Sequence, residues 1–100
     1  KFERFIFDLL PQAKNAFVVE AVAADSFAPV KNETGAPADT AELARQAISE
    51  LHRDWLVRAG VAVDSGVQVE INPRFALDPR ELAEKIPPNL RVGSNRYFDA

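Results

Sequence analysis

The feature that most constrains the fold is a long helical pattern in the middle of the chain, at residues 39–60, DTAELARQAISELHRDWLVRAG. Apolar residues recur there every three or four positions, as they do on the buried side of an amphipathic helix. They are Leu43, Ala47, Ile48, Leu51, Trp55 and Ala59. Asp39 is the expected N-cap, Glu42 can complete a capping box, and Gly60 is placed to end the helix. We therefore predict one long central helix, with Trp55 in the core.

Two apolar segments precede this helix. Residues 1–15, KFERFIFDLLPQAKN, have the apolar spacing of an amphipathic helix that ends or breaks near Pro11. Phe7 lies off the apolar stripe, so we expect its ring to cover something. Residues 16–22, AFVVEAV, are β-branched and almost continuously apolar. This composition favours a strand buried on both faces. The loop at residues 23–39 is longer than a simple turn, and long ordered loops are often functional.

The C-terminal part predicts shorter elements. Residues 61–71 suggest two strands about a turn at residues 64–66. A short helix should follow, with Asp78 as cap, Pro79 at its first position and a capping box completed by Glu81. Pro87 and Pro88 should stop that helix, and the tail allows two short strands around Gly93. The order of elements predicts an α+β fold, or the end of an α/β domain.

Composition sets limits on the class of protein. One hundred residues make one domain or a piece of a larger one, with a net charge of −3. That charge, and the absence of any run of Lys or Arg, argue against nucleic-acid and membrane-surface binding. The chain contains no cysteine, which fits a cytoplasmic location and excludes disulfides and thiolate chemistry. It begins with Lys and contains no methionine, so we expect a processed or excised fragment.

The residues alone form no complete active site. His52 is the only histidine, and a helix-surface or partly packed imidazole is its expected role. Without a second histidine or a cysteine, a histidine-based metal site is not expected. No serine lies in a nucleophile elbow, and the four glycines do not form a phosphate-binding loop.

Lys31 remains open to two interpretations. It lies in the turn-prone sequence DSFAPVKNETG, residues 25–35, directly after the apolar segment. Most single lysines are solvated surface charges. A lysine can also serve as a compact positive charge for a phosphate group, and Asn32 beside it would help to fix the loop. The residues themselves do not decide between these roles.

Residues 1–73 contain four motifs in order: KFERFIFDLLPQAKNAFVVEA, FAPVKN, TAELARQAISELHRDWLVRAG and EINP. Together these motifs resemble the C-terminal part of the UDP-N-acetylhexosamine pyrophosphorylases, within the wider family of UDP-sugar pyrophosphorylases. The resemblance covers residues 1–73 and weakens over residues 74–100. It implies that the chain is the C-terminal portion of an α/β nucleotidyltransferase of the nucleotide-diphospho-sugar transferase type, with a mixed sheet and a long central helix.

The resemblance also implies an activity and a set of residues. Members of the family join UTP to a sugar 1-phosphate and release pyrophosphate, with Mg²⁺ steadying the phosphates. Lys31 matches the family lysine that reaches the phosphates of the nucleotide sugar, and Lys1 matches a second basic residue near them. Phe5 and Phe7 match aromatic side chains beside the sugar. Asn32 is expected to shape the loop and not to touch the ligand.

Some family features are absent from these 100 residues. The Gly-rich UTP loop, the uracil-binding residues and the Mg²⁺ ligands are not among them, so we expect the isolated chain to be inactive. Eukaryotic members carry an arginine where this chain has Ala24-Asp25-Ser26-Phe27, which leaves the sugar open. The alternative is a non-catalytic α+β module that binds a partner or associates with itself, because a fragment is expected to expose apolar surface.

Overall fold

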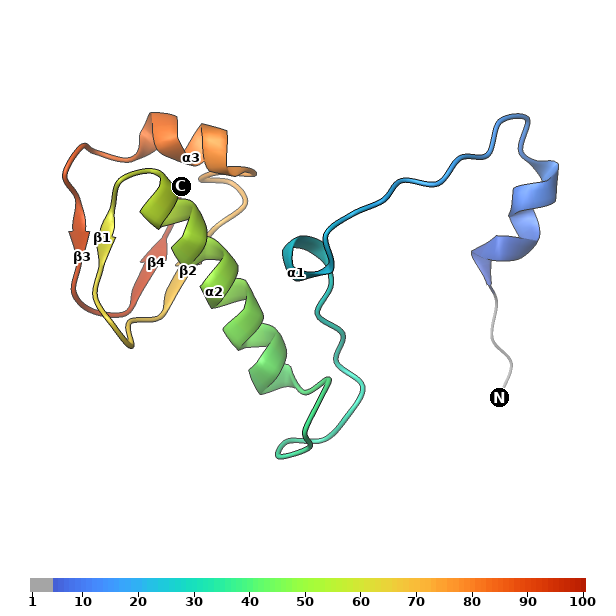
Figure 1. Cartoon of the computed structure of the whole chain (residues 1–100), viewed down its shortest axis with the longest axis horizontal. Coiled ribbons are helices and arrows are strands. Elements are labelled where there is room, and N and C mark those ends of the chain that lie inside the picture. Colours follow the sequence, from blue (N-terminus) through green and yellow to red (C-terminus); the bar gives the residue numbers. More distant parts are fainter. Residues whose placement is uncertain (1–4) are drawn as a thin grey trace.

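The computed structural model describes residues 5–100, which form a compact body and an extended arm (Figure 1). We call residues 40–100 the body and residues 5–22 the arm; residues 23–39 connect them. The radius of gyration is 17.7 Å and the molecule measures 51 × 38 × 22 Å. A compact domain of this length would have a radius of gyration of about 13 Å. The arm, which projects away from the body, accounts for the difference.

The long central helix is present as α2, Ala41–Arg58. Its N-cap is Thr40, whose buried hydroxyl accepts a hydrogen bond from the backbone N–H of Leu43. The predicted cap, Asp39, is wrong by one residue, because Asp39 has a left-handed backbone with φ of 56°. The N-cap residue of a helix needs an extended backbone, which Thr40 has. Gly60, with φ of 87°, follows the last turn as predicted.

Within residues 5–100, four short strands form two parallel pairs. β1, Ala62–Val63, pairs with β3, Arg91–Val92, and β2, Val69–Ile71, pairs with β4, Arg96–Phe98. The predicted hairpin between β1 and β2 is therefore wrong, although the chain does turn between them. The chain passes through β1 and then β2, and after α3 it follows a similar path through β3 and then β4. We call each of these two passes a coil. Each strand of the first coil therefore lies beside the equivalent strand of the second coil (Figure 1).

The short helix α3, Pro79–Lys85, connects the two coils and confirms its prediction. Asp78 Oδ1 accepts hydrogen bonds from the backbone N–H groups of Arg80 and Glu81, as an N-cap does. The predicted capping box is wrong in its partner, because the Glu81 carboxylate accepts from the N–H of Leu77, one residue before the cap, and not from the N–H of Asp78. The helix ends at Lys85, shortly before the two prolines.

The core lies between the second half of α2, α3 and the strands. Its buried residues are Leu56, Val61, Val69, Ile71, Ala76, Leu82, Val92 and Phe98. Trp55 is partly buried and packs against this cluster, as predicted. The predicted buried side of α2 is only partly correct, since Leu43 and Ile48 near its start remain 41% and 45% exposed. The body therefore has a real but small core, concentrated around Leu56.

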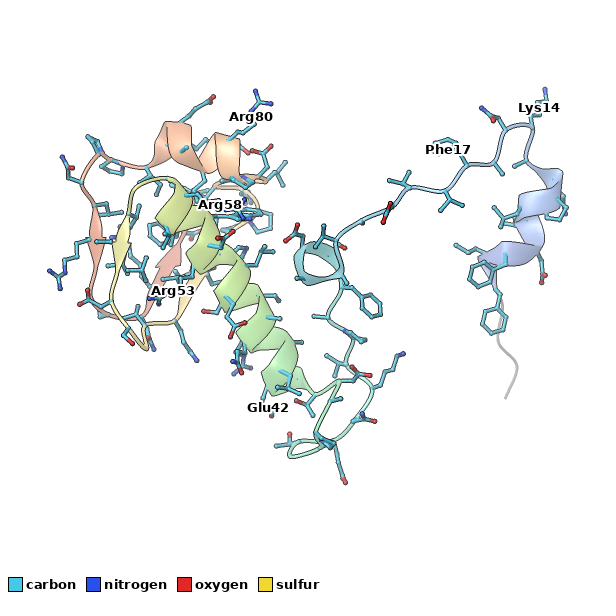
Figure 2. The ribbon with its side chains drawn as sticks, viewed as in Figure 1. Lys14, Phe17, Glu42, Arg53, Arg58 and Arg80 are labelled. Atoms are coloured by element: carbon cyan, nitrogen blue, oxygen red, sulfur yellow. The ribbon has the colours of Figure 1, made fainter. Side chains whose placement is uncertain are left out.

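Side chains of α2 also fix the two coils through hydrogen bonds. Ser49 Oγ accepts from the N–H of Val69, and His52 Nδ1 accepts from the N–H of Ile71. Both amides lie on the edge of β2 that does not face β4. Arg53 donates to the backbone carbonyls of Val63, at the end of β1, and of Asp64 and Val67 in the segment that joins β1 to β2 (Figure 2). The helix thus satisfies polar backbone groups that the short strands leave unpaired.

The arm contains no buried residue. Its helix η1, Ile6–Gln12, is a 3₁₀ helix and not the amphipathic α-helix that the apolar spacing predicted, and it ends one residue after Pro11, near the predicted end. Residues 16–22 are extended but form no strand, and Val18 is 96% exposed. The predicted buried strand is wrong in this structure, because none of residues 5–100 covers or pairs with the segment. Figure 2 shows Phe17 on this part of the arm, away from the body.

A short helix, α1, Ala23–Ser26, interrupts the predicted loop and packs beside α2. The described helices and strand pairs agree with an α+β arrangement. Both described strand pairs are parallel. Over residues 5–100, no helix combines the length and apolar character that crossing a bilayer requires.

Candidate ligand-binding loop

Residues 31–39, here called the Lys31 loop, are closed by hydrogen bonds at their two ends. The backbone N–H groups of Lys31 and Asn32 both donate to the carbonyl of Asp39, at 2.8 and 3.0 Å. The side-chain amide of Asn32 donates to the carbonyl of Ala38 at 2.8 Å. The loop begins and ends at neighbouring points, and its end leads directly into α2. Lys31 is therefore attached to the start of a rigid helix.

Backbone conformations inside the loop explain why this sequence can close. Gly35 has φ of 92°, which costs a glycine little, and Asp39 adopts the left-handed region that aspartate tolerates better than most residues. The Thr34 hydroxyl donates to Glu42 Oε1 at 2.8 Å, which ties the tip of the loop to the first turn of α2. This bond and a backbone hydrogen bond lower the pKa of Glu42, the backbone bond being the larger cause.

Lys31 itself is exposed. A hollow of about 530 Å³ lies next to the loop, between the first half of α2, β2 and β4. Val30, the neighbour of Lys31, forms part of its wall together with Ile48 and Tyr97. Arg45 and Arg96 add positive charge to the hollow, and Glu70 adds negative charge. A second hollow of about 300 Å³ lies between α1 and α2, around Phe27 and Leu51. The Lys31 side chain lines neither hollow.

The two predicted aromatic residues lie together on the arm. The rings of Phe5 and Phe7 are stacked, with centroids 6.2 Å apart and an angle of 22° between their planes. Both are more than half exposed. The arm carries them away from the Lys31 loop, so the structure does not bring the aromatic pair and Lys31 together (Figure 1). Lys1, the other predicted substrate-binding residue, lies outside the described residues.

His52 has the structural role that its sequence position suggested. It is half-buried, its ring lies 5.3 Å from that of Trp55, and its Nδ1 accepts the hydrogen bond from Ile71. Burial lowers the pKa of His52, and the negative charge of Glu70 opposes this effect. The imidazole is therefore neutral near pH 7 and is engaged with the backbone. It is not placed for proton transfer to a ligand.

Sequence reasoning identified Lys31 and Asn32 but missed the partners that hold them. The hydrogen bond from Thr34 to Glu42 joins residues eight positions apart, and no motif marks it. The role of the Asp39 carbonyl was equally hidden, because backbone acceptors leave no trace in a sequence. As for metals, residues 5–100 contain no group of three or more His, Cys, Asp or Glu side chains that could hold an ion.

The sequence is similar to one segment of several longer proteins. It is 38% identical over 78 residues to UDP-N-acetylglucosamine diphosphorylase 2 of Arabidopsis thaliana, a match that covers 73% of this chain and 16% of that protein. It is 34% identical over 86 residues to UDP-N-acetylglucosamine pyrophosphorylase of Saccharomyces cerevisiae, covering 84% of this chain and 18% of the yeast protein. The human UDP-N-acetylhexosamine pyrophosphorylase-like protein 1 is 40% identical over 60 residues, covering 60% and 12% respectively. No family model matches the chain.

These matches confirm the resemblance seen in the sequence. An uninterrupted stretch of 73% of a 100-residue chain must include residues 28–73, wherever it begins, so the Lys31 loop lies within the segment matched to the Arabidopsis protein. The chain spans less than a fifth of the length of these relatives. The similarity is therefore to one segment of each of these longer proteins.

Proposed function

We propose that this chain, a homologue of one segment of the UDP-N-acetylhexosamine pyrophosphorylases, forms part of a uridylyltransferase. The complete enzyme would make a UDP-N-acetylhexosamine and pyrophosphate from UTP and the sugar 1-phosphate. The similarity to proteins named as UDP-N-acetylglucosamine and UDP-N-acetylhexosamine pyrophosphorylases carries this proposal. The sequence resemblance supplies the residue roles, and the closed Lys31 loop is compatible with them.

In this reaction a phosphate oxygen of the sugar 1-phosphate attacks the α-phosphorus of UTP. The bond between the α-phosphorus and the bridging oxygen breaks, and pyrophosphate leaves with the electron pair. Such a transfer depends on holding the two phosphates in line and on stabilising the charge that builds up. We assign Lys31 to the phosphates as a compact cation. Its anchored backbone would carry the ammonium group to a defined place.

Lys1, Phe5 and Phe7 complete the proposed assignment. Lys1 would add a second cation near the phosphates, and the stacked rings of Phe5 and Phe7 would lie against the sugar. The exposure of both rings leaves their faces available for such a contact. The arm would have to lie closer to the Lys31 loop in the complete enzyme than it does here.

Magnesium is the cofactor proposed for the complete enzyme, where it would neutralise the phosphate oxygens. The residues described here do not fit an all-protein magnesium site, since residues 5–100 contain no suitable group of ligands. We therefore assign no step of the reaction on this chain to the metal.

The test is a substitution in the natural full-length protein that carries these residues. Lys31→Ala should lower kcat by about a hundredfold or more, because removal of one stabilising group in a preorganised site has effects of this size. The melting temperature should change little, since the side chain is exposed. Arg80→Ala, which removes an exposed cation on α3, is the matched control and should leave kcat unchanged. Wild-type turnover in the Lys31 variant would reject the assignment.

The exposed arm favours a second candidate function. Phe17, Val18 and Val19 expose large apolar side chains along one extended segment, which is unusual for a monomeric domain. The chain would then be a non-catalytic α+β module that associates with itself or with a partner. Sedimentation of the 100-residue chain at rising concentration, with and without millimolar UDP-sugar, separates the two functions. Self-association without nucleotide binding in either the chain or the full-length protein favours the module.

A further inference from the structure

We propose that Asn32 is a positioning residue for Lys31 and acts through the hydrogen bond that its side chain donates across the loop. This inference rests on the proposed role of Lys31 at the phosphates. It extends that proposal because it names the group that holds the lysine in place and predicts how the two residues depend on each other.

The geometry places three hydrogen bonds side by side where the loop closes. The N–H groups of Lys31 and Asn32 share the Asp39 carbonyl, and the Asn32 side-chain amide reaches the carbonyl of Ala38. The first two bonds involve backbone alone, so any residue except proline could make them. The third needs a short side chain with an N–H donor, which asparagine supplies and aspartate does not. It is therefore the only one of the three that depends on the identity of the side chain.

This bond controls the position of Lys31 because of where it acts. Lysine has a flexible four-carbon stem, so the location of its ammonium group depends first on where its Cα is held. The Cα of Lys31 is held by the closure to residues 38 and 39, which lead directly into the cap of α2. Asp39 occupies a left-handed conformation that costs an ordinary residue some free energy. Without the Asn32 bond, the loop has fewer interactions to maintain that conformation.

A direct ligand role for Asn32 is less compatible with the same geometry. One of its two Nδ2–H donors is already bonded to the Ala38 carbonyl at 2.8 Å, which fixes the direction of the side chain across the loop. The bond is exposed to solvent, so it contributes little to global stability. Its loss should therefore alter the position of Lys31 without unfolding the body. That separation makes the proposal testable.

The test is a double-mutant cycle in the natural full-length protein, with kcat for UDP-sugar formation as the readout. Asn32→Asp keeps the size of the side chain but removes the donor, and it should lower kcat about tenfold, since small displacements of reacting groups have large effects on rate. Asn32→Ala should do the same. In a Lys31→Ala background, Asn32→Asp should have no further effect, because its action passes through the lysine. Gln46→Ala is the matched control. It removes an exposed side-chain hydrogen bond, from Gln46 Nε2 to Glu50 Oε1 on α2, and it should leave kcat unchanged.

A second readout does not depend on catalysis. Hydrogen exchange at the Lys31 and Asn32 amides of the 100-residue chain should be faster in Asn32→Asp than in wild type, while amides of α2 should be unaffected. Equal loss of kcat from Asn32→Asp with and without Lys31 would overturn the proposal, as would unchanged exchange at both amides. If Lys31→Ala retains full activity, the proposed function of Lys31 fails and the positioning role fails with it. Faster amide exchange would then show only that the Asn32 bond holds the loop closed.

Discussion

The body and the arm are both rich in large apolar side chains, but only the body buries them. Leu56 and Leu82 in the body are fully buried, whereas Val18 in the arm is 96% exposed and Phe17 is 78% exposed. The difference does not come from composition. In the body, α2 provides a layer against which the strands pack; the arm has no such layer among the described residues. An apolar sequence pattern therefore predicts a need for burial, and the presence of a partner decides whether burial occurs.

The largest expected effect is a cavity in the body. Leu56→Ala should lower the free energy of unfolding of the 100-residue chain by about 2–5 kcal/mol, because it removes a fully buried side chain from the centre of a small core. Urea denaturation followed by Trp55 fluorescence measures the change. The matched arm variant is Val18→Ala, which should change stability by less than about 0.5 kcal/mol. A similar loss in both variants would show that the arm is packed in solution and would abolish the distinction between the two regions.

The second effect concerns the hydrogen bonds that hold the coils to α2. Arg53 donates to the carbonyls of Val63, Asp64 and Val67. Arg53→Met keeps much of the apolar stem but leaves partly buried carbonyls without a donor, so stability should fall by about 1–3 kcal/mol.

Arg58→Met is the control for Arg53. Arg58 lies on the same helix, and its pair with Asp54 is largely exposed, so its removal should change stability by about 0.5 kcal/mol or less. Urea denaturation of both variants gives the comparison. Equal effects would mean that solvent replaces the Arg53 bonds without loss and that apolar packing alone holds the coils to α2.

The third effect is smaller and lies at the border between the connecting segment and the body. Thr40→Ala should lower stability by about 1 kcal/mol, because the threonine hydroxyl caps α2. Asp39→Gly should leave stability unchanged or raise it, since glycine adopts φ of 56° without strain. Thermal denaturation followed by circular dichroism at 222 nm measures both. If only the Asp39 variant loses stability, Asp39 and not Thr40 is the N-cap of α2 in solution, as the sequence predicted.

These comparisons show which features the sequence could predict. Signals that act within one helical turn were sufficient: Asp78 and Pro79 start α3, and Gly60 ends α2. The cap of α2 was misplaced because Asp39 and Thr40 are both good capping residues, and the backbone conformation decides between them. Local patterns are reliable here because the interactions that produce them are themselves local.

Features that depend on distant partners could not be predicted. The turn near Gly66 suggested a hairpin, but β1 and β2 pair with strands that follow α3. Periodicity indicates that a segment is a strand and says nothing about which strand lies beside it. The candidate site shows the same division. Lys31 was proposed from its loop and a family resemblance, and its role stays a prediction, whereas its anchoring by the Asp39 carbonyl needed coordinates.

The last prediction uses pH to test the hydrogen bond between His52 on α2 and Ile71 on β2. Burial lowers the pKa of His52 in the folded chain below its ordinary value of 6.5, which the unfolded chain retains. Above pH 6.5 both states are neutral and the stability is fully present. As the pH falls below 6.5, the unfolded state binds more protons, so stability decreases until the folded imidazole also titrates. Protonation also removes the acceptor for the Ile71 N–H.

His52→Gln keeps an acceptor oxygen without a titratable ring, so its urea midpoint should decline less than that of wild type between pH 7.5 and 5.5. Parallel declines would place the pH dependence on the carboxylates and leave His52 as packing alone.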